Sequence, residues 1–178
     1  MSDDERLLSA ARQLDQEALR TIFDSHSSSI FHYALRLCQD AVEADNIVGD
    51  VFAVLIERLA QGKGPTSNLR SYLFQIAYHI VVDRARARKH TAPLEAADFT
   101  PRDETSLDMQ AENDIMMTSV IKAMQSDLTH DQYHALLLRF VEGFSLQETA
   151  EIMGKNINNV KVIQKRALDK LRRVLNRS

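Results

Sequence analysis

The 178-residue chain has no tryptophan, five glycines and three prolines. All-β folds depend on many tight turns, and such turns are rich in glycine and proline. Their scarcity disfavours a sandwich or barrel, while frequent leucine, alanine, isoleucine, arginine and glutamate favour helices. We therefore expect an all-helical protein, with 44% hydrophobic residues to build its cores.

Cysteine is almost missing too, since Cys38 stands alone in the sequence. It has no partner for an internal disulfide or at metal-site spacing, which is typical of proteins in a reducing cytosol. The acidic start, Met-Ser-Asp-Asp-Glu, is unlike a signal peptide, and no run approaches the roughly 18 apolar residues of a membrane span. These absences predict a soluble protein with a cytoplasmic location.

Catalytic signatures are also missing from the sequence. It contains no phosphate-binding glycine-rich motif, no nucleophile elbow and no evident pair of catalytic carboxylates. His130 and His134 have the helical spacing of zinc ligands, but no glutamate follows the first histidine and no third ligand is apparent. We expect no enzyme activity, no cofactor and no metal.

The net charge is only −3, but the charges are unevenly distributed. Residues 1–61 hold eleven acidic and five basic side chains, whereas 62–90 hold six basic and one acidic. Residues 91–114 are again acidic, seven to one, and 156–178 are basic, also seven to one. Two basic patches in an acidic protein suggest contacts with nucleic acid.

Apolar residues recur at helical spacing throughout the first 90 residues, which we interpret as one domain. A serine-rich stretch at 26–29 interrupts the apolar pattern of residues 15–38, which suggests two helices or one kinked helix there. Glycine and proline at 61–65 end the third predicted helix, and Ser67 or Asn68 can cap the fourth. The predicted helices span 4–12, 15–38, 42–60 and 69–89.

The periodic pattern lapses after residue 90 and resumes near residue 112. Residues 91–111 contain two prolines and many acidic side chains, which is typical of a flexible linker. Residues 112–178 form a second predicted domain with short connections, as in small helical bundles. Its predicted helices span 112–125, 129–141, 145–153 and 156–176.

The strongest local motif in the second domain is a predicted helix-turn-helix. Ser145 and Glu148 have capping-box spacing, and Gly154 stands where a helix C-cap needs a positive φ. In this motif the second helix enters the major groove of DNA with its N-terminal end first. Amides can bind adenine edges, and lysine can reach guanine or phosphate. The predicted DNA-facing residues are Asn156, Asn158, Asn159, Lys161, Gln164 and Lys165.

The basic residues near the end of this helix have a second explanation. Cations at a helix C-terminus complement the helix dipole, so they need no DNA contact. For the following side chains the two explanations remain equally open: Lys170, Arg172, Arg173 and Arg177.

Both halves of the chain resemble extracytoplasmic-function sigma factors, the small group of the sigma-70 family. Residues 128–172 resemble the family's fourth region, and 43–52 with 69–86 resemble its second region. The two regions occur in the family's order and cover nearly all of the chain outside the linker. The chain departs from the family pattern at Asn46 and Gly49, on the helix expected to contact core polymerase. It also departs at Val162-Ile163 in the recognition helix, so the promoter sequence cannot be copied from other members.

The resemblance implies two roles for the first domain. One helix, 45–59, would dock on the clamp helices of the largest polymerase subunit, with Asp45, Asn46 and Asp50 as polar contacts, although a solvated helix face also explains these side chains. The loop at 62–68 and the basic helix after it would capture the minus-ten element as single-stranded DNA. The residues expected to do so are Lys63, Thr66, Ser67, Asn68, Arg70, Tyr72, His79, Arg84 and Arg86.

The second domain would read the minus-thirty-five element as duplex DNA. The implied partners are core RNA polymerase, promoter DNA in duplex and single-stranded form, and an anti-sigma factor. The acidic linker would pass through the polymerase cleft. An alternative is a stand-alone helix-turn-helix regulator that binds duplex operators, but this explains only the second domain.

Overall fold

The computed structural model describes residues 2–91 and 113–177, and every regular element in these two stretches is a helix. This confirms the predicted all-helical fold in the described part of the chain. No helix there is long and apolar enough to cross a membrane. The elements are α1 (Asp3–Arg12), α2 (Gln16–Cys38), α3 (Ala41–Ala60), α4 (Leu69–Thr91), α5 (Asn113–Asp127), α6 (His130–Leu136), the π-helix η1 (Leu137–Val141), α7 (Leu146–Met153) and α8 (Ile157–Leu175).

The N-terminal unit comprises α1 to α4, with α2 packed against both α3 and α4. The side chains of Asp15 and Asp40 cap α2 and α3 by accepting hydrogen bonds from backbone N–H groups in the first turns. The apolar stripes of the three long helices then meet in one core. Its fully buried members include Ile22, Ile30, Tyr33, Ile47, Leu55, Leu73 and Phe74.

The first alternative predicted at 26–29, a division into two helices, is wrong, because α2 is one continuous helix of 23 residues. Ile22 and Ile30 lie on either side of the serine-rich stretch and are both fully buried. Serine hydroxyls in such a helix can bond to the carbonyl one turn earlier, as the Ser25 hydroxyl does to Thr21 at 2.7 Å. Tertiary packing therefore outweighs the weak helix propensity of serine.

The C-terminal unit comprises α5 to α8. The helix predicted at 129–141 changes character halfway, since α6 passes directly into the π-helical turn η1. The hydrogen bonds of this turn reach back five residues instead of four, as in the bond from the Glu142 N–H to the Leu137 carbonyl at 2.9 Å. The chain then reverses through Gly143, whose φ of 77° favours glycine.

The predicted helix-turn-helix is formed by α7 and α8. Ser145 and Glu148 make both hydrogen bonds of the capping box at the start of α7. Gly154 ends that helix with a φ of 62°, and Asn156 caps α8. The local signals in the sequence therefore predicted the beginning and end of α7 correctly.

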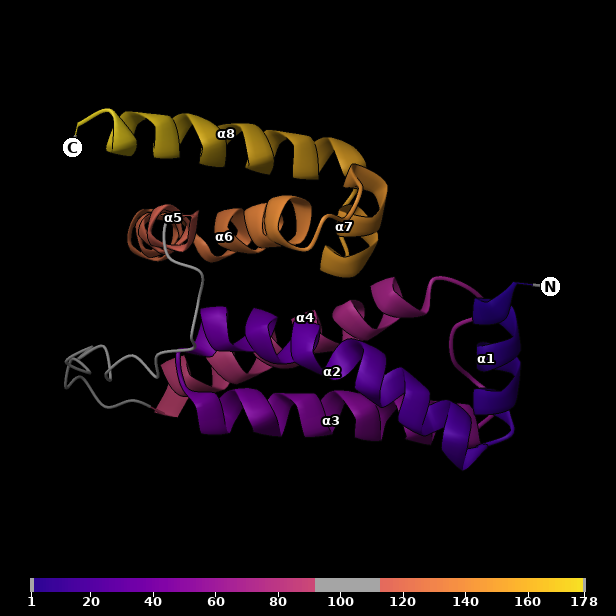
Figure 1. Cartoon of the computed structure of the whole chain (residues 1–178). Helices are drawn as coiled ribbons and strands as arrows, with labels where there is room; N and C mark the ends of the chain where they lie inside the picture. Colours follow the sequence, from indigo (N-terminus) through magenta and orange to yellow (C-terminus); the bar gives the residue numbers. More distant parts are fainter. Residues whose placement is uncertain (1, 92–112, 178) are drawn as a thin grey trace.

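The two units lie as two layers that contact each other, with α7 against α4 (Figure 1). Thr91 is the last residue of α4, and the rest of the predicted linker at 91–111 lies outside the described residues. Helix α7 of the helix-turn-helix therefore packs directly on α4, the helix that follows the loop at 61–68.

Candidate nucleic-acid interface

The N-terminal half of α8 presents most of the predicted duplex-binding residues. The Asn156 side chain accepts a hydrogen bond from the Asn159 N–H at 2.8 Å, so it also holds the helix start. Val160 is fully buried and fixes the opposite face of the helix against the unit's core. The predicted residues exposed on α8 and its cap are Asn156, Asn158, Asn159, Lys161 and Lys165.

Gln164 differs from the other predicted residues because it is half-buried. Its Oε1 accepts a hydrogen bond from Arg139 Nε at 3.0 Å, and Arg139 Nη1 donates to the Phe144 carbonyl at 2.6 Å. Gln164 therefore connects α8 to the turn before α7. Sequence reasoning missed Arg166, which is exposed on α8 and follows Asn158 by eight residues, a spacing that keeps both on one helix face.

The loop between α3 and α4 has a backbone fixed at several points. Gly62 and Gly64 have φ values of 70° and 130°, and Asn68 has a φ of 51°. The Pro65 carbonyl accepts a hydrogen bond from Arg12 Nη2 at 2.7 Å, which ties the loop to the end of α1. The predicted loop residues exposed around these anchors are Lys63, Thr66, Ser67 and Asn68.

A cavity of about 540 Å³ lies between this loop, α1 and α2. Ser67, Asn68 and Arg70 line it together, as the predicted strand pocket requires, whereas Lys63 and Thr66 do not. Sequence reasoning missed His26, which lines the same cavity and lies in the serine-rich stretch of α2. Burial first and the Arg70 charge second lower the pKa of His26, so its neutral ring can both donate and accept a hydrogen bond.

Tyr72 and His79 lie elsewhere on α4, where they line a separate cavity of about 250 Å³. Tyr72 accepts a hydrogen bond from Arg58 Nη1 at 3.2 Å, and the Arg58 guanidinium lies 5.9 Å from the centre of the tyrosine ring. The structure therefore does not gather the predicted strand-binding residues in one hollow. Arg58, which the sequence did not single out, belongs to the second hollow.

The basic end of α4 forms ion pairs with α3. Arg84 binds Asp50, and Arg88 binds Glu43 at 2.8 Å. A residue predicted to bind DNA thus contacts one predicted to bind polymerase. Arg86 is exposed on α4, and Asp45 and Asn46 are exposed on α3.

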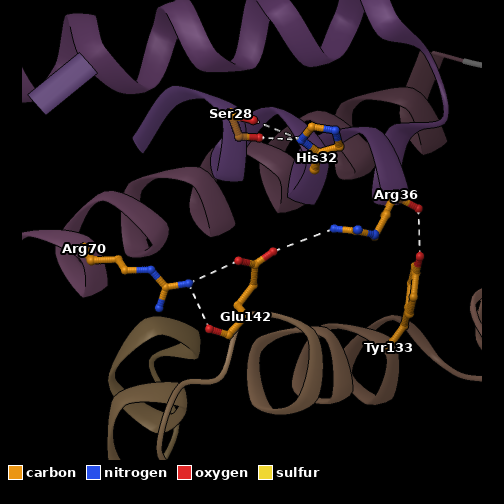
Figure 2. A network of polar contacts seen from close by, with 6 residues as sticks. All are labelled: Ser28, His32, Arg36, Arg70, Tyr133 and Glu142. Carbon is orange, nitrogen blue, oxygen red and sulfur yellow. Dashed lines mark hydrogen bonds and ion pairs between the residues drawn. The ribbon is translucent and has the colours of Figure 1, made fainter. Parts of the chain in front are cut away.

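A polar network joins the two units (Figure 2). Arg70 Nη2 donates to the Glu142 carbonyl at 2.9 Å and to its carboxylate at 3.2 Å, and Arg36 lies 3.8 Å from the same carboxylate. Burial raises the pKa of Glu142, and the two arginines oppose this shift. The Tyr133 hydroxyl donates to the Arg36 carbonyl at 2.9 Å.

Aromatic side chains fill the rest of this contact. Phe74 of α4 packs against Phe144 with ring centres 5.1 Å apart. Tyr33 and His134 share a hydrogen bond of 2.8 Å, and both are buried. His134 Nδ1 thus has a protein partner, and no group of three or more metal-ligating side chains occurs among the described residues.

Two family models match the chain: Sigma-70 region 2 over residues 22–91, and Sigma-70 region 4 over residues 126–173. Their order is that of the two helical units, with region 2 beginning within α2 and region 4 beginning at the end of α5. The extracytoplasmic-function (ECF) RNA polymerase sigma factor BldN of Streptomyces coelicolor is 23% identical over 173 residues. These residues are 95% of this chain, which spans 64% of the length of BldN.

Solved structures show the same fold. The structure of CnrH in complex with the cytosolic domain of CnrY matches with a TM-score of 0.74 at 19% identity, covering 99% of both chains. RpoE in complex with the anti-sigma factor NepR from Bartonella quintana matches with a TM-score of 0.59 at 24% identity, covering 93% of this chain and 98% of RpoE. With both regions of the family present in order, the chain belongs to the sigma-70 family of RNA polymerase sigma factors and is a member of its extracytoplasmic-function group.

Proposed function

We propose that the chain binds core RNA polymerase, directs it to specific promoters and assists their melting. One observation carries this proposal: a single chain joins an exposed helix-turn-helix face to a cavity of about 540 Å³ whose lining includes Ser67, Asn68 and His26. The first surface suits duplex DNA and the second suits an unpaired strand. A stand-alone duplex-binding regulator has no use for the second surface.

Region 4 is proposed to read the minus-thirty-five element through the first turns of α8. Asn158, Asn159 and Lys161 are exposed there, with amides for base edges and a cation for guanine or phosphate. Lys165 lies one turn further along the helix and is also exposed. Asn156 holds the helix start, so its side chain contributes chiefly to positioning this surface.

Region 2 is proposed to bind the minus-ten element as an unpaired strand. Ser67, Asn68 and the neutral His26 surround the cavity and can satisfy the edge of a flipped base. Lys63 and Arg86 are exposed cations on the flanking loop and helix, and they can bind the backbone phosphates. Tyr72 and His79 offer a second hollow with an aromatic ring for stacking.

Melting without ATP hydrolysis requires that strand binding offset unstacking, which costs a few kcal/mol per base. The chain is proposed to supply this binding energy and sequence specificity, while catalysis belongs to the polymerase. No cofactor is needed for such a role. As a polymerase subunit, the protein would act in the cytoplasm.

The outer face of α3 is proposed to dock on core polymerase. Asp45 and Asn46 are exposed there, and Asp50 is exposed although it pairs with Arg84. An anti-sigma factor is a further proposed partner. Support comes from the similar fold of RpoE, whose structure was solved in complex with the anti-sigma factor NepR.

Reconstitution with core RNA polymerase tests the proposed function. The chain should co-elute with core enzyme in gel filtration, and the complex should give run-off transcripts from specific promoters in a genomic fragment library. A stand-alone regulator would instead bind duplex DNA by itself and leave core polymerase non-specific. That result would overturn the proposal.

A further inference from the structure

Arg70 lies at the start of α4 beside the proposed strand cavity, yet region 4 already holds its guanidinium. Arg70 Nη2 donates to both the carboxylate and the backbone carbonyl of Glu142 (Figure 2). The guanidinium carbon also lies 4.1 Å from the centre of the Phe144 ring. The segment 142–144 thus provides the Arg70 guanidinium with a negative charge, hydrogen-bond acceptors and an aromatic ring to stack on.

The Glu142 carboxylate binds Arg70 as a DNA phosphate would. Arginine binds carboxylates and phosphates through the same planar N–H donors, so the two acceptors compete for one group. The Glu142 side chain is only 9% exposed and has Arg36 as a second cation, which makes it a well-enclosed competitor. The Arg70 side chain is 38% exposed, but a phosphate can bind its Nη2 group only after Glu142 moves.

Three more contacts hold the two units in this packed arrangement, which we call the closed form. Tyr33 hydrogen-bonds His134, Tyr133 hydrogen-bonds the Arg36 carbonyl, and Phe74 packs on Phe144. They come from α2 and α4 on one side and from α6 and the start of α7 on the other. The contacts of Glu142 with Arg70 are therefore part of a larger interface between the two units.

The closed form treats the two DNA-reading surfaces differently. In region 4, Asn158, Asn159, Lys161 and Lys165 remain exposed on α8. The contacts with the N-terminal unit come instead from α5, α6, the turn at 142–144 and α7. Duplex reading therefore keeps its side chains free, whereas strand reading loses the Nη2 group of Arg70.

We propose that the segment 142–144 of region 4 is an intramolecular inhibitor of the strand-binding site, in which Glu142 takes the place of a DNA phosphate on Arg70. This inference rests on the proposed function of region 2 in strand binding. In the free chain the closed form suppresses binding of unpaired DNA but not of duplex DNA. Separation of the two regions on the polymerase releases Arg70.

The test measures DNA binding by the free full-length chain. The probes are a labelled single strand with the minus-ten element, and a duplex with the minus-thirty-five element, of a promoter mapped by run-off transcription. Glu142→Lys places a cation beside Arg70 and Arg36 and should open the molecule. Binding of the single strand should tighten by about tenfold, equivalent to about 1.4 kcal/mol of released contact energy.

Glu151→Lys is the matched control, because Glu151 is exposed on α7 and the variant makes the same change in charge. It should raise the affinity for both probes alike through general electrostatics. Glu142→Lys should exceed this control on the single strand only. Adding Arg70→Ala to Glu142→Lys should remove the excess, because the released group is then missing.

Tyr33→Phe opens the interface without adding charge, since it deletes the hydrogen bond to His134. It should also tighten single-strand binding, and X-ray scattering should show a larger radius of gyration for both opening variants. The general charge effect measured with Glu151→Lys is first subtracted. Equal single-strand affinities of wild type, Tyr33→Phe and Glu142→Lys would then show that segment 142–144 does not inhibit strand binding. If the chain directs run-off transcription in the same preparations, that failure leaves the proposed function intact, whereas loss of transcription in all of them refutes the function itself.

Discussion

Tyr33 and His134 lie 101 positions apart in the chain and share a hydrogen bond of 2.8 Å across the contact between the two regions. Burial first and the neighbouring His130 second lower the pKa of His134 to about 3, while Asp131 opposes the shift. Burial raises the pKa of Tyr33, so its hydroxyl keeps its proton and shares the hydrogen bond with a neutral imidazole. The Tyr78 ring completes the enclosure in a T-shaped contact with His134, with ring centres 4.9 Å apart.

Acidification is therefore predicted to open the closed form. The pKa of His134 is about 3 when closed and returns towards 6.5 when open, so its contribution to closure is complete above pH 6.5 and is lost as the pH falls towards 3. Between pH 7.5 and 5.5 this one group should shift the equilibrium towards the open form by about tenfold. The radius of gyration from X-ray scattering at several pH values measures the shift.

The control for this prediction is His134→Gln, whose amide oxygen can still accept the Tyr33 hydrogen bond but does not titrate. Glu142 acts in the opposite direction, because its pKa is raised in the closed form. Its effect remains in the control and can be subtracted. A pH profile that is the same in wild type and His134→Gln would contradict the assignment to His134.

A second prediction concerns Gly49 in the middle of α3. It is exposed, and nothing lies within 4 Å of the place where a Cβ would stand. A mid-helix glycine costs about 0.5–1 kcal/mol relative to alanine, so Gly49→Ala should raise the free energy of unfolding by that amount. Urea denaturation followed by circular dichroism measures the change.

Gly64→Ala provides a contrast within the same region. Gly64 has a φ of 130°, and an added Cβ would lie 3.0 Å from Leu59 Cδ2. This variant should lower the free energy of unfolding, because the backbone conformation disfavours a side chain and the Leu59 side chain would have to shift. Equal effects of the two substitutions would show that helix propensity and backbone strain are not what separates the two glycines.

Local signals in the sequence predicted local structure well. The capping box at Ser145 and the glycine at 154 gave the correct ends of α7, because both act through hydrogen bonds and φ angles within a few residues. The serine-rich stretch of α2 misled for the same reason, since its local preference is outweighed by the burial of Ile22 and Ile30. The π-helical turn at 137–141 likewise has no local signal that sets it apart from an ordinary helix.

The contact between the two regions lay beyond the reach of sequence patterns. Periodicity shows which face of a helix is apolar, but not which other face it will meet. Arg70 and Glu142 are 72 positions apart, and each charge taken alone is typical of an exposed residue. Only the fold shows that the two meet beside Phe144, and that His26 joins Ser67 and Asn68 around one cavity.

A third prediction concerns the recognition helix. Lys161→Ala and Lys165→Ala should each weaken binding to the minus-thirty-five duplex and reduce the slope of log affinity against log salt by about 0.9, as expected for one lost phosphate contact. Titration at several salt concentrations by fluorescence anisotropy measures both quantities. Lys122→Ala is the control, because Lys122 is an exposed cation on α5 outside the helix-turn-helix. A slope unchanged in both α8 variants would remove these lysines from the interface.

The last prediction separates strand capture from duplex binding in the polymerase complex. His26→Ala and Ser67→Ala remove polar groups from the cavity beside the α3–α4 loop and leave α8 untouched. A lost hydrogen bond to an enclosed base costs about 1–3 kcal/mol, so each variant should lower the fraction of melted promoter by about tenfold or more. Permanganate reactivity of unpaired thymines reports this fraction, and gel shifts with duplex DNA report closed binding, which should stay at the wild-type level.

Thr66→Ala is the matched control, since Thr66 is exposed on the same loop but does not line the cavity. If the cavity variants melt promoters as well as Thr66→Ala does, the extruded base is bound elsewhere, and the hollow beside Tyr72 and His79 becomes the site to test.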